Sequence, residues 1–269
     1  MRLAQTGLDI DLNEATGELT FGEVVLCEGW SHKTLGQMAG LYDSLDGCNL
    51  EQRVYWAYRN IRRAEDDALW VPRGLRYDIT VLLPGAANGE LFKTSGHYHG
   101  YAQGQPLPYP ELYEVLTGSV AFVLQRSPWL KADGTGVEPV DEVCIMNASA
   151  GEAIVIPPLW GHASVNLSDG PSAFSNIAVV DTPLLYDPVQ SRHGLLQRVV
   201  GTPEIVSTQR NLSWQSDPFS IVDVPLEVPD LGVVFGRPCY QAYVDNPGRF
   251  GYLLDPEPYV GRMEELLGA

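Results

Sequence analysis

Three histidines and one glutamate have the types and spacing to hold a metal ion. His97 and His99 are two residues apart, and side chains at i and i+2 of a strand project from the same face. Neighbouring strands could then supply Glu111 and His162. Three neutral imidazoles and one carboxylate suit iron(II), manganese, zinc or nickel, and an octahedral ion would keep two positions for substrate or water. We therefore expect these four residues to form a catalytic metal site.

The segments that must position these ligands read as short strands. Strand-like stretches occur at residues 54–58, 77–83 and 112–124. Turn-forming pairs punctuate the chain, namely Pro84-Gly85, Asn88-Gly89 and Asp133-Gly134. Short strands separated by Gly and Pro turns are typical of an all-β sandwich or barrel.

The two ends of the chain are expected to flank this domain. Residues 31–42 read as a short helix with Leu35, Met38 and Leu41 on one side, so residues 1–50 are predicted to form an N-terminal arm. After Asp181 the sequence is rich in proline, and residues 260–267 resemble a last helix. We predict that residues 187–269 form an extension with short helices that wraps the barrel or a partner subunit. A small separate domain, or an arm exchanged between subunits, is the alternative.

Composition excludes several classes of function. Lys and Arg total 17 against 34 Asp and Glu, which gives a formal net charge of -17 over 269 residues. Such a charge opposes binding to nucleic acid or to an anionic membrane, so an anionic substrate has to be held by local donors. The four cysteines are scattered, the start of the chain lacks the apolar core of a signal peptide, and no apolar run approaches the ~20 residues of a membrane span. We expect a cytoplasmic protein that acts on a small molecule.

The spacing around the ligands resembles a known pattern. Six residues separate Glu111 from Gly118, and five separate Gly151 from Pro157, as in the two-part motif of the cupin superfamily. Within cupins, residues 94–99 and 110–118 resemble the cupin-type glucose-6-phosphate isomerases of archaea and some bacteria, and residues 160–166 are similar as well. The resemblance covers roughly residues 8 to 186.

This resemblance implies a fold, a ligand set and a substrate site. It implies a jelly-roll-like antiparallel β-barrel over residues 51–186, a homodimer, and one divalent ion, with Fe(II) favoured and Mn, Zn or Ni as alternatives. The matching metal ligands are His97, His99, Glu111 and His162. Catalytic roles fall to Glu111 and to Tyr113, which matches a tyrosine lining the sugar site. Glu111 would be ligand and base in a proton transfer through an enediolate, or ligand alone in a metal-assisted hydride shift, and the sequence leaves both open. The residues matched to the substrate site are Thr80, Thr94 and Gly96 at the phosphate, together with Tyr55 and Tyr186.

Two features depart from the family pattern. Residues 100–110 are longer than the corresponding general cupin segment and predict a mobile lid, and the chain near Leu184 lacks a counterpart to a substrate-site histidine. Isomerisation of a sugar phosphate, from aldose to ketose, is the favoured function. The alternatives are a mononuclear non-heme iron(II)-dependent oxygenase acting on a specialised metabolite, and a non-catalytic ligand-binding cupin.

Two charged neighbours of the motif are expected to lie outside the site. Glu114 would point to the strand face opposite Glu111 and be solvated or paired. An inward Thr94 would turn Lys93 outward. His193 is expected at the surface, and so is His32, on the predicted helix.

Overall fold

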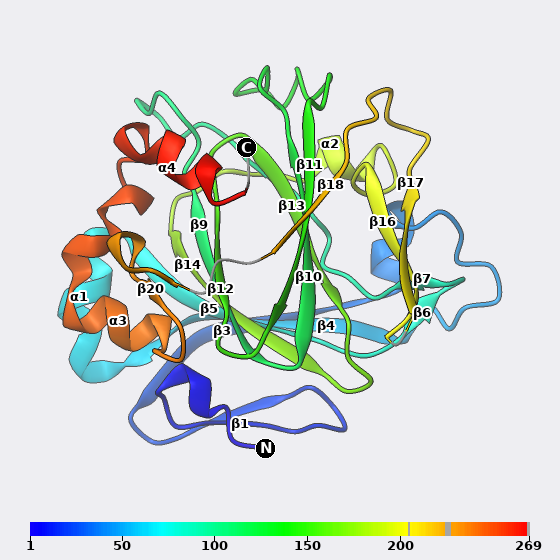
Figure 1. Ribbon diagram of the computed structural model, residues 1–269. Coiled ribbons are helices and arrows are strands. Elements are labelled where there is room, and N and C mark those ends of the chain that lie inside the picture. Colours follow the sequence, from blue (N-terminus) through cyan, green and yellow to red (C-terminus); the bar gives the residue numbers. More distant parts are fainter. Residues whose placement is uncertain (204, 224–226, 268–269) are drawn as a thin grey trace.

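The computed structural model describes residues 1–203, 205–223 and 227–267, and it consists mainly of β-strands (Figure 1). The strands are β1 (Ile10–Leu12), β2 (Leu19–Phe21), β3 (Val25–Thr34), β4 (Arg53–Arg63), β5 (Leu75–Leu82), β6 (Ala86–Ala87), β7 (Glu90–Leu91), β8 (Tyr98–His99), β9 (Glu111–Thr117), β10 (Ser119–Arg126), β11 (Glu142–Ser149), β12 (Ala153–Ile156), β13 (Trp160–Asn166), β14 (Ser172–Val179), β15 (Leu184–Leu185), β16 (Gln197–Thr202), β17 (Ile205–Arg210), β18 (Ser220–Asp223), β19 (Glu227–Val228) and β20 (Val233–Val234).

The helices are short and lie mostly near the two ends of the chain. The α-helices are α1 (Asp67–Trp70), α2 (Asp187–Gln190), α3 (Cys239–Asp245) and α4 (Val260–Glu265). The 3₁₀ turns are η1 (Ala4–Thr6), η2 (Gly36–Leu41), η3 (Ala64–Asp66), η4 (Val71–Arg73), η5 (Pro229–Leu231), η6 (Pro247–Leu253) and η7 (Glu257–Tyr259). Among the described residues, no helix is both long and apolar enough to cross a membrane.

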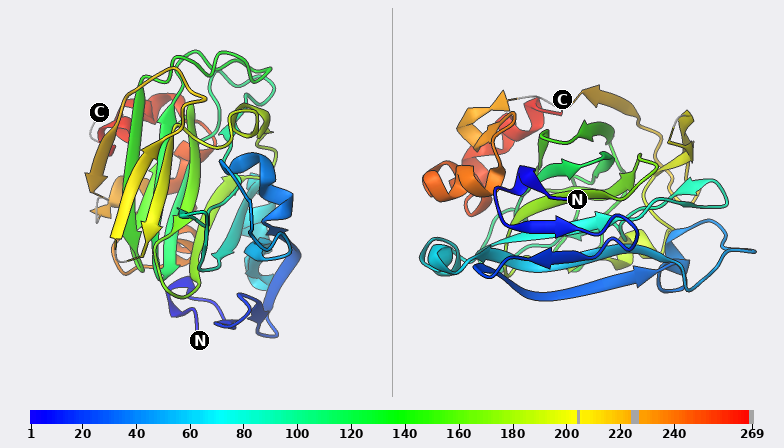
Figure 2. Two further views of the ribbon diagram at one scale, coloured as in Figure 1. Left: turned by 90° about the vertical axis from the view of Figure 1, so that its right-hand side faces the viewer. Right: turned by 90° about the horizontal axis from the view of Figure 1, so that it is seen from below.

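Two sheets pack face to face and form a jelly-roll-like all-β domain (Figures 1 and 2). The six-stranded sheet has the order β12-β9-β14-β5-β4-β3, and the four-stranded sheet has the order β13-β10-β11-β18. The neighbouring strands are antiparallel except β11 and β18, which are parallel. Aromatic rings fill the space between the sheets, where Phe122 of β10 lies 5.4 Å from Tyr113 of β9 and 5.8 Å from Phe174 of β14. The prediction of an all-β cupin fold is confirmed.

The outer faces of both sheets are covered as well, which explains why β9 and β14 are buried on both sides. Leu196, Val199 and Trp214 belong to the apolar cluster on the outer face of the four-stranded sheet. Helix α3 covers the outer face of the six-stranded sheet, and its Tyr243 ring lies 4.0 Å from Trp70. Residues beyond 187 therefore pack on both faces of this same chain, although the domain boundaries stay a prediction.

The helix predicted for residues 31–42 is wrong in its first half. Ser31 to Thr34 continue β3, which pairs with β4 along the edge of the large sheet and carries His32. The 3₁₀ turn η2 follows, and Leu35, Met38 and Leu41 are buried as the pattern indicated. Their spacing of three residues fits the three residues per turn of a 3₁₀ helix better than an α-helix.

Glu114, on the same strand as Glu111, forms hydrogen bonds to segments near both ends of the chain. It lies on the outer face of β9 and is 2% exposed, so the alternative that it is solvated is wrong. Its Oε2 accepts the backbone N–H of Cys239 at 2.9 Å, and its Oε1 accepts the Gln5 amide at 3.4 Å. Burial raises the pKa of Glu114 to about 7, although the hydrogen bond from Cys239 opposes the rise.

This raised pKa predicts a pH-dependent stability. The folded protein binds the Glu114 proton more tightly than the unfolded chain, so the stabilisation is present at pH 5 and is lost as the pH rises through about 7. Relative to Glu114→Gln, wild-type protein should lose on the order of 3 kcal/mol in the free energy of unfolding between pH 5 and pH 8. Urea denaturation of both proteins at several pH values measures this difference, and parallel pH curves would contradict the assignment.

Candidate metal centre and active-site cavity

The segment before β8 is held against β13 by its backbone. His97 and His162 exchange two backbone hydrogen bonds, N–H of His97 to O of His162 at 3.1 Å and the reverse at 3.0 Å. Tyr98 points the other way, and its ring packs so closely on Gly161 that a Cβ there would lie 2.5 Å from the ring. Glycine is thus required at position 161 for this approach, which places the imidazoles of residues 97, 99 and 162 on one side.

The four expected ligands converge. One ligand atom from each of His97, His99, Glu111 and His162 lies within 4.8 Å of the others. Glu111 Oε2 is 3.2 Å from His99 Nε2 and 3.3 Å from His162 Nε2. His97 Nε2 is buried without a hydrogen-bond partner in the part of the chain that is described. An unpaired buried nitrogen beside a carboxylate and two further imidazole nitrogens is a donor set that fits a divalent cation.

The surrounding groups prepare the imidazoles for this role. His99 Nδ1 lies 2.7 Å from the Tyr109 carbonyl, which can accept a hydrogen bond from a protonated Nδ1 and so directs Nε2 towards Glu111. Burial and the neighbouring imidazoles His162 and His99 lower the pKa of His97 well below its usual value, so this ring stays in its neutral, ligating form. Residues 100–110 thus supply a carbonyl to the site, while their motion as a lid stays a prediction.

Glu111 is buried and ionised. Burial by itself would raise its pKa, but hydrogen bonds to His162 and His99 hold the pKa of Glu111 well below its usual value. Its Oε1 accepts the Asn176 amide at 2.7 Å, and its Oε2 accepts the Tyr113 hydroxyl at 3.0 Å. Burial and the charge of Glu111 raise the pKa of Tyr113 well above its usual value, so Tyr113 remains a hydrogen-bond donor.

All ten residues predicted for the site line one cavity. They are Tyr55, Thr80, Thr94, Gly96, His97, His99, Glu111, Tyr113, His162 and Tyr186. Lys93 is turned away from this cavity, as expected, but it is buried rather than exposed to solvent. It is 7% exposed, pairs with Glu90 and donates to the Leu41 carbonyl at 2.7 Å. His193 is exposed, whereas His32 is half-buried and its ring lies 5.1 Å from Trp56.

The cavity also contains polar residues that the sequence analysis missed. They include Arg59, Arg76, Asn176 and Thr182. The signal for Arg76 was present, because it lies four residues before Thr80 on the same strand and so shares its face. Asn176 lies between Tyr113 and Asp78 in a row across β9, β14 and β5, so its position depends on strand register.

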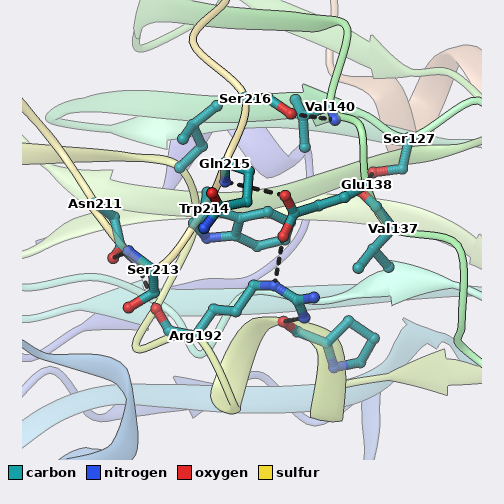
Figure 3. Close-up of polar contacts among 12 residues, drawn as sticks. Ser127, Val137, Glu138, Val140, Arg192, Asn211, Ser213, Trp214, Gln215 and Ser216 are labelled. Atoms are coloured by element: carbon teal, nitrogen blue, oxygen red, sulfur yellow. Dashed lines mark hydrogen bonds and ion pairs between the residues drawn. The ribbon is translucent and has the colours of Figure 1, made fainter.

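Residues after position 187 form contacts that position the segment carrying Tyr186 beside the cavity. Arg192, shortly after α2, donates to Glu138 at 3.1 Å and stacks over the Trp214 ring at 4.7 Å. The backbone N–H of Gln215 donates to the same carboxylate at 3.0 Å, and Figure 3 shows both groups converging on Glu138. Tyr186 itself lies with its ring 5.2 Å from that of His97.

Comparisons with known proteins agree with this geometry. The family model described as glucose-6-phosphate isomerase (GPI) matches residues 33–215. The glucose-6-phosphate isomerase of Thermococcus onnurineus is 29% identical over 142 residues, which cover 53% of this chain and 66% of that protein. That of Thermococcus kodakarensis is 26% identical over 212 residues, covering 78% of this chain and 96% of that protein. The match thus spans just under two thirds of the length of the first of these relatives.

Solved structures show a weaker likeness. A single-residue variant of oxalate decarboxylase from Bacillus subtilis has a TM-score of 0.34 and 12% identity, over 62% of this chain and 33% of that chain. The capsular polysaccharide assembling protein CapF from Staphylococcus aureus has a TM-score of 0.27 and 16% identity, over 38% and 22%.

The fold and the cluster of three histidines and one glutamate define a cupin with a candidate metal centre. Within the cupins, the chain belongs to the glucose-6-phosphate isomerase (GPI) family, whose model matches more than half of its length.

The ligand set predicts a specific loss of metal on substitution. Glu111→Gln should weaken the binding of Fe(II) or Mn by more than about tenfold, because an amide is a poorer ligand than a carboxylate for these cations. Equilibrium dialysis with metal analysis measures this. His193→Asn is the matched control, since His193 is exposed and has a φ of 57°, which asparagine tolerates. Metal content in Glu111→Gln equal to that of the control would remove Glu111 from the site.

Proposed function

We propose that this protein is a metal-dependent isomerase that interconverts the aldose and ketose forms of a sugar phosphate such as glucose 6-phosphate. The observation that carries the proposal is that the four candidate ligands and the candidate phosphate donors open into one cavity. Family membership supports the same activity. Dimerisation and a cytoplasmic location stay predictions.

The cavity offers donors for the phosphate in addition to the candidate metal ligands. The hydroxyls of Thr80 and Thr94 and the backbone near Gly96 can bind the phosphate oxygens without a dense basic patch. Thr94 Oγ1 is positioned by the backbone N–H of Ser164, which it accepts at 3.0 Å. A bound phosphate would fix the far end of the open-chain sugar and bring its C1 and C2 to the cluster of ligands.

The reaction itself is a proton transfer between adjacent carbons. A divalent ion in this site would supply a Lewis acid that polarises the sugar carbonyl and the neighbouring hydroxyl. Glu111 takes the proton from C2, the C–H electron pair forms the C1=C2 double bond, and negative charge passes to O1. A proton moves from O2 to O1, the proton on Glu111 returns to C1, and C2 becomes the ketone, so no atom is gained or lost.

Glu111 and Tyr113 have the arrangement that these steps need. Glu111 faces the imidazoles of His99 and His162 through Oε2, while Oε1, next to Asn176, offers a second oxygen for the proton. Tyr113 stays protonated and can donate a hydrogen bond to an oxygen of the sugar. Its hydroxyl also lies 3.1 Å from His162 Nε2, so it sits beside the ligand atoms.

The test of this function measures isomerisation and oxygen uptake on the same protein preparation. Protein is prepared without oxygen, loaded separately with Fe(II), Mn, Zn or Ni, and assayed for conversion of glucose 6-phosphate to fructose 6-phosphate and for oxygen uptake. We expect isomerisation that depends on the added metal and consumes no oxygen. Oxygen uptake by the iron-loaded protein with no isomerisation would favour the oxygenase alternative. Metal and sugar phosphate binding with neither reaction would indicate a binding cupin.

The phosphate contact predicts a selective change in kinetics. Thr80→Val should raise the KM for glucose 6-phosphate by about tenfold or more, because a hydrogen bond to a charged group contributes about 1.5–3 kcal/mol. Because the phosphate is remote from the reacting carbons, kcat should change little. Thr208→Val, at an exposed position of β17, is the control. An unchanged KM in Thr80→Val would exclude Thr80 from the phosphate site.

A further inference from the structure

Two arginines inside the cavity share a single carboxylate. Asp78 is fully buried, and its Oδ2 lies 2.8 Å from Arg59 Nη1 and 3.0 Å from Arg76 Nε. Its Oδ1 accepts the backbone N–H of Asn60 at 2.8 Å. One negative charge therefore faces two positive charges, and a net positive charge remains on this side of the cavity.

The arginine pair lies away from the candidate phosphate donors. On β5, Arg76 and Thr80 are four residues apart, which places their Cα atoms about 13 Å apart along the strand. On the neighbouring strand β4, Ala57 is the residue paired with Thr80. Arg59 lies two residues further along β4, in the direction of Arg76. On this sheet face Arg76 thus lies at the other end from Thr80, and Arg59 lies between them.

The end of the cavity that carries the candidate phosphate donors adjoins a hollow that contains a different cationic side chain, Lys33. Four residues line both the cavity and an adjoining hollow, namely Tyr55, Ser95, Gly96 and Tyr186, and this hollow is also lined by Lys33. Lys33 on β3 pairs with Tyr55 on β4. A phosphate held there does not need the arginine pair for its charge.

The arginine pair instead lies beside the metal ligands. In the rows across the sheet, Asp78 is aligned with Asn176 and Tyr113, and Arg76 is aligned with Ala178. Burial opposes the charged form of Arg59, but the negative charges of Asp78 and Glu111 help to raise its pKa, so this guanidinium lies within electrostatic reach of the Glu111 carboxylate. Arg59 thus faces the end of the cavity where the sugar carbons react.

We propose that Arg59 and Arg76 form a second anion subsite that holds negative charge at the reacting end of a sugar phosphate. The inference rests on the proposed function, because the phosphate defines which end of the sugar reacts. The charge has two possible sources: the enediolate oxygen formed during isomerisation, or a carboxylate that the substrate carries permanently. Fixed guanidinium donors in a partly enclosed cavity stabilise either kind of oxyanion.

The test compares two ligands that differ only at C1. Sorbitol 6-phosphate ends in a neutral CH₂OH group, and 6-phosphogluconate ends in a carboxylate. Titration calorimetry with the metal-loaded protein gives the Kd of each, and the ratio of the two Kd values measures recognition of the charged end. Any contact between the carboxylate and the ion is common to all variants and cancels when their ratios are compared.

Arg59→Met should reduce the preference for 6-phosphogluconate by about tenfold or more and leave the Kd of sorbitol 6-phosphate within about twofold of wild type. That unchanged Kd also shows that the variant is folded, and Arg76 remains to pair with Asp78. Arg59→Lys, which keeps the charge, should retain most of the preference. Thr80→Val should weaken both ligands equally.

Three results would overturn the inference in distinguishable ways. Equal weakening of both ligands in Arg59→Met would mean that the arginine holds the phosphate. An unchanged ratio would mean that Arg59 only neutralises Asp78. If wild-type protein binds neither ligand, the proposed sugar phosphate function fails and the subsite fails with it.

Kinetics on glucose 6-phosphate then separate the two sources of charge. If the charge is the enediolate, Arg59→Met lowers kcat about tenfold or more with little change in KM, since the interaction forms only during turnover. If kcat is unchanged while the binding preference is lost, the subsite serves a carboxylate on a phosphorylated sugar acid.

Discussion

The buried carboxylate of Glu111 is the constraint around which the site is built. A charged group taken out of water needs compensation, and here three imidazoles, a tyrosine hydroxyl and the Asn176 amide surround it. Burial holds the His97 imidazole in its neutral form, in which it can bind a metal ion. A buried carboxylate close to a neutral imidazole nitrogen that has no hydrogen-bond partner among the described residues fits a bound cation. The strands that carry these groups must therefore meet at this point.

The rest of the fold keeps these groups at their distances. The paired backbones of His97 and His162 and the contact of Tyr98 on Gly161 bring the loop before β8 against β13. On its far side Tyr98 hydrogen-bonds to Ser127 at 2.8 Å and to Gln125 at 2.5 Å, and Gln125 in turn accepts the backbone N–H of Leu196 at 2.7 Å. A short path of hydrogen bonds thus links the extension after residue 187 to the segment that carries two of the candidate ligands. The extension contributes to the geometry of the site as well as covering apolar surface.

Much of the site could be predicted from the sequence because the informative groups are rare residue types at short, regular spacing. His97 and His99 define a strand face by themselves, and Glu111 and His162 follow at family spacing. Arg59 could not be placed in this way, because its meeting with Asp78 depends on how β4 and β5 are aligned. The helix expected at residues 31–42 failed for a related reason, since pairing of β3 with β4 outweighs local periodicity. Strands β18 and β11 pair in parallel although they lie more than seventy residues apart in the sequence. No local sequence pattern predicts this pairing.

The central claim is that one divalent ion in this cluster enables isomerisation of a sugar phosphate. The most direct measurement is a titration of metal-free protein with Fe(II) or Mn in the absence of oxygen, with bound metal and glucose 6-phosphate turnover followed in the same samples. We expect turnover to rise in proportion to bound metal and to stop rising at one ion per chain. Full turnover without bound metal, or one bound ion with no turnover of any aldose phosphate, would contradict it.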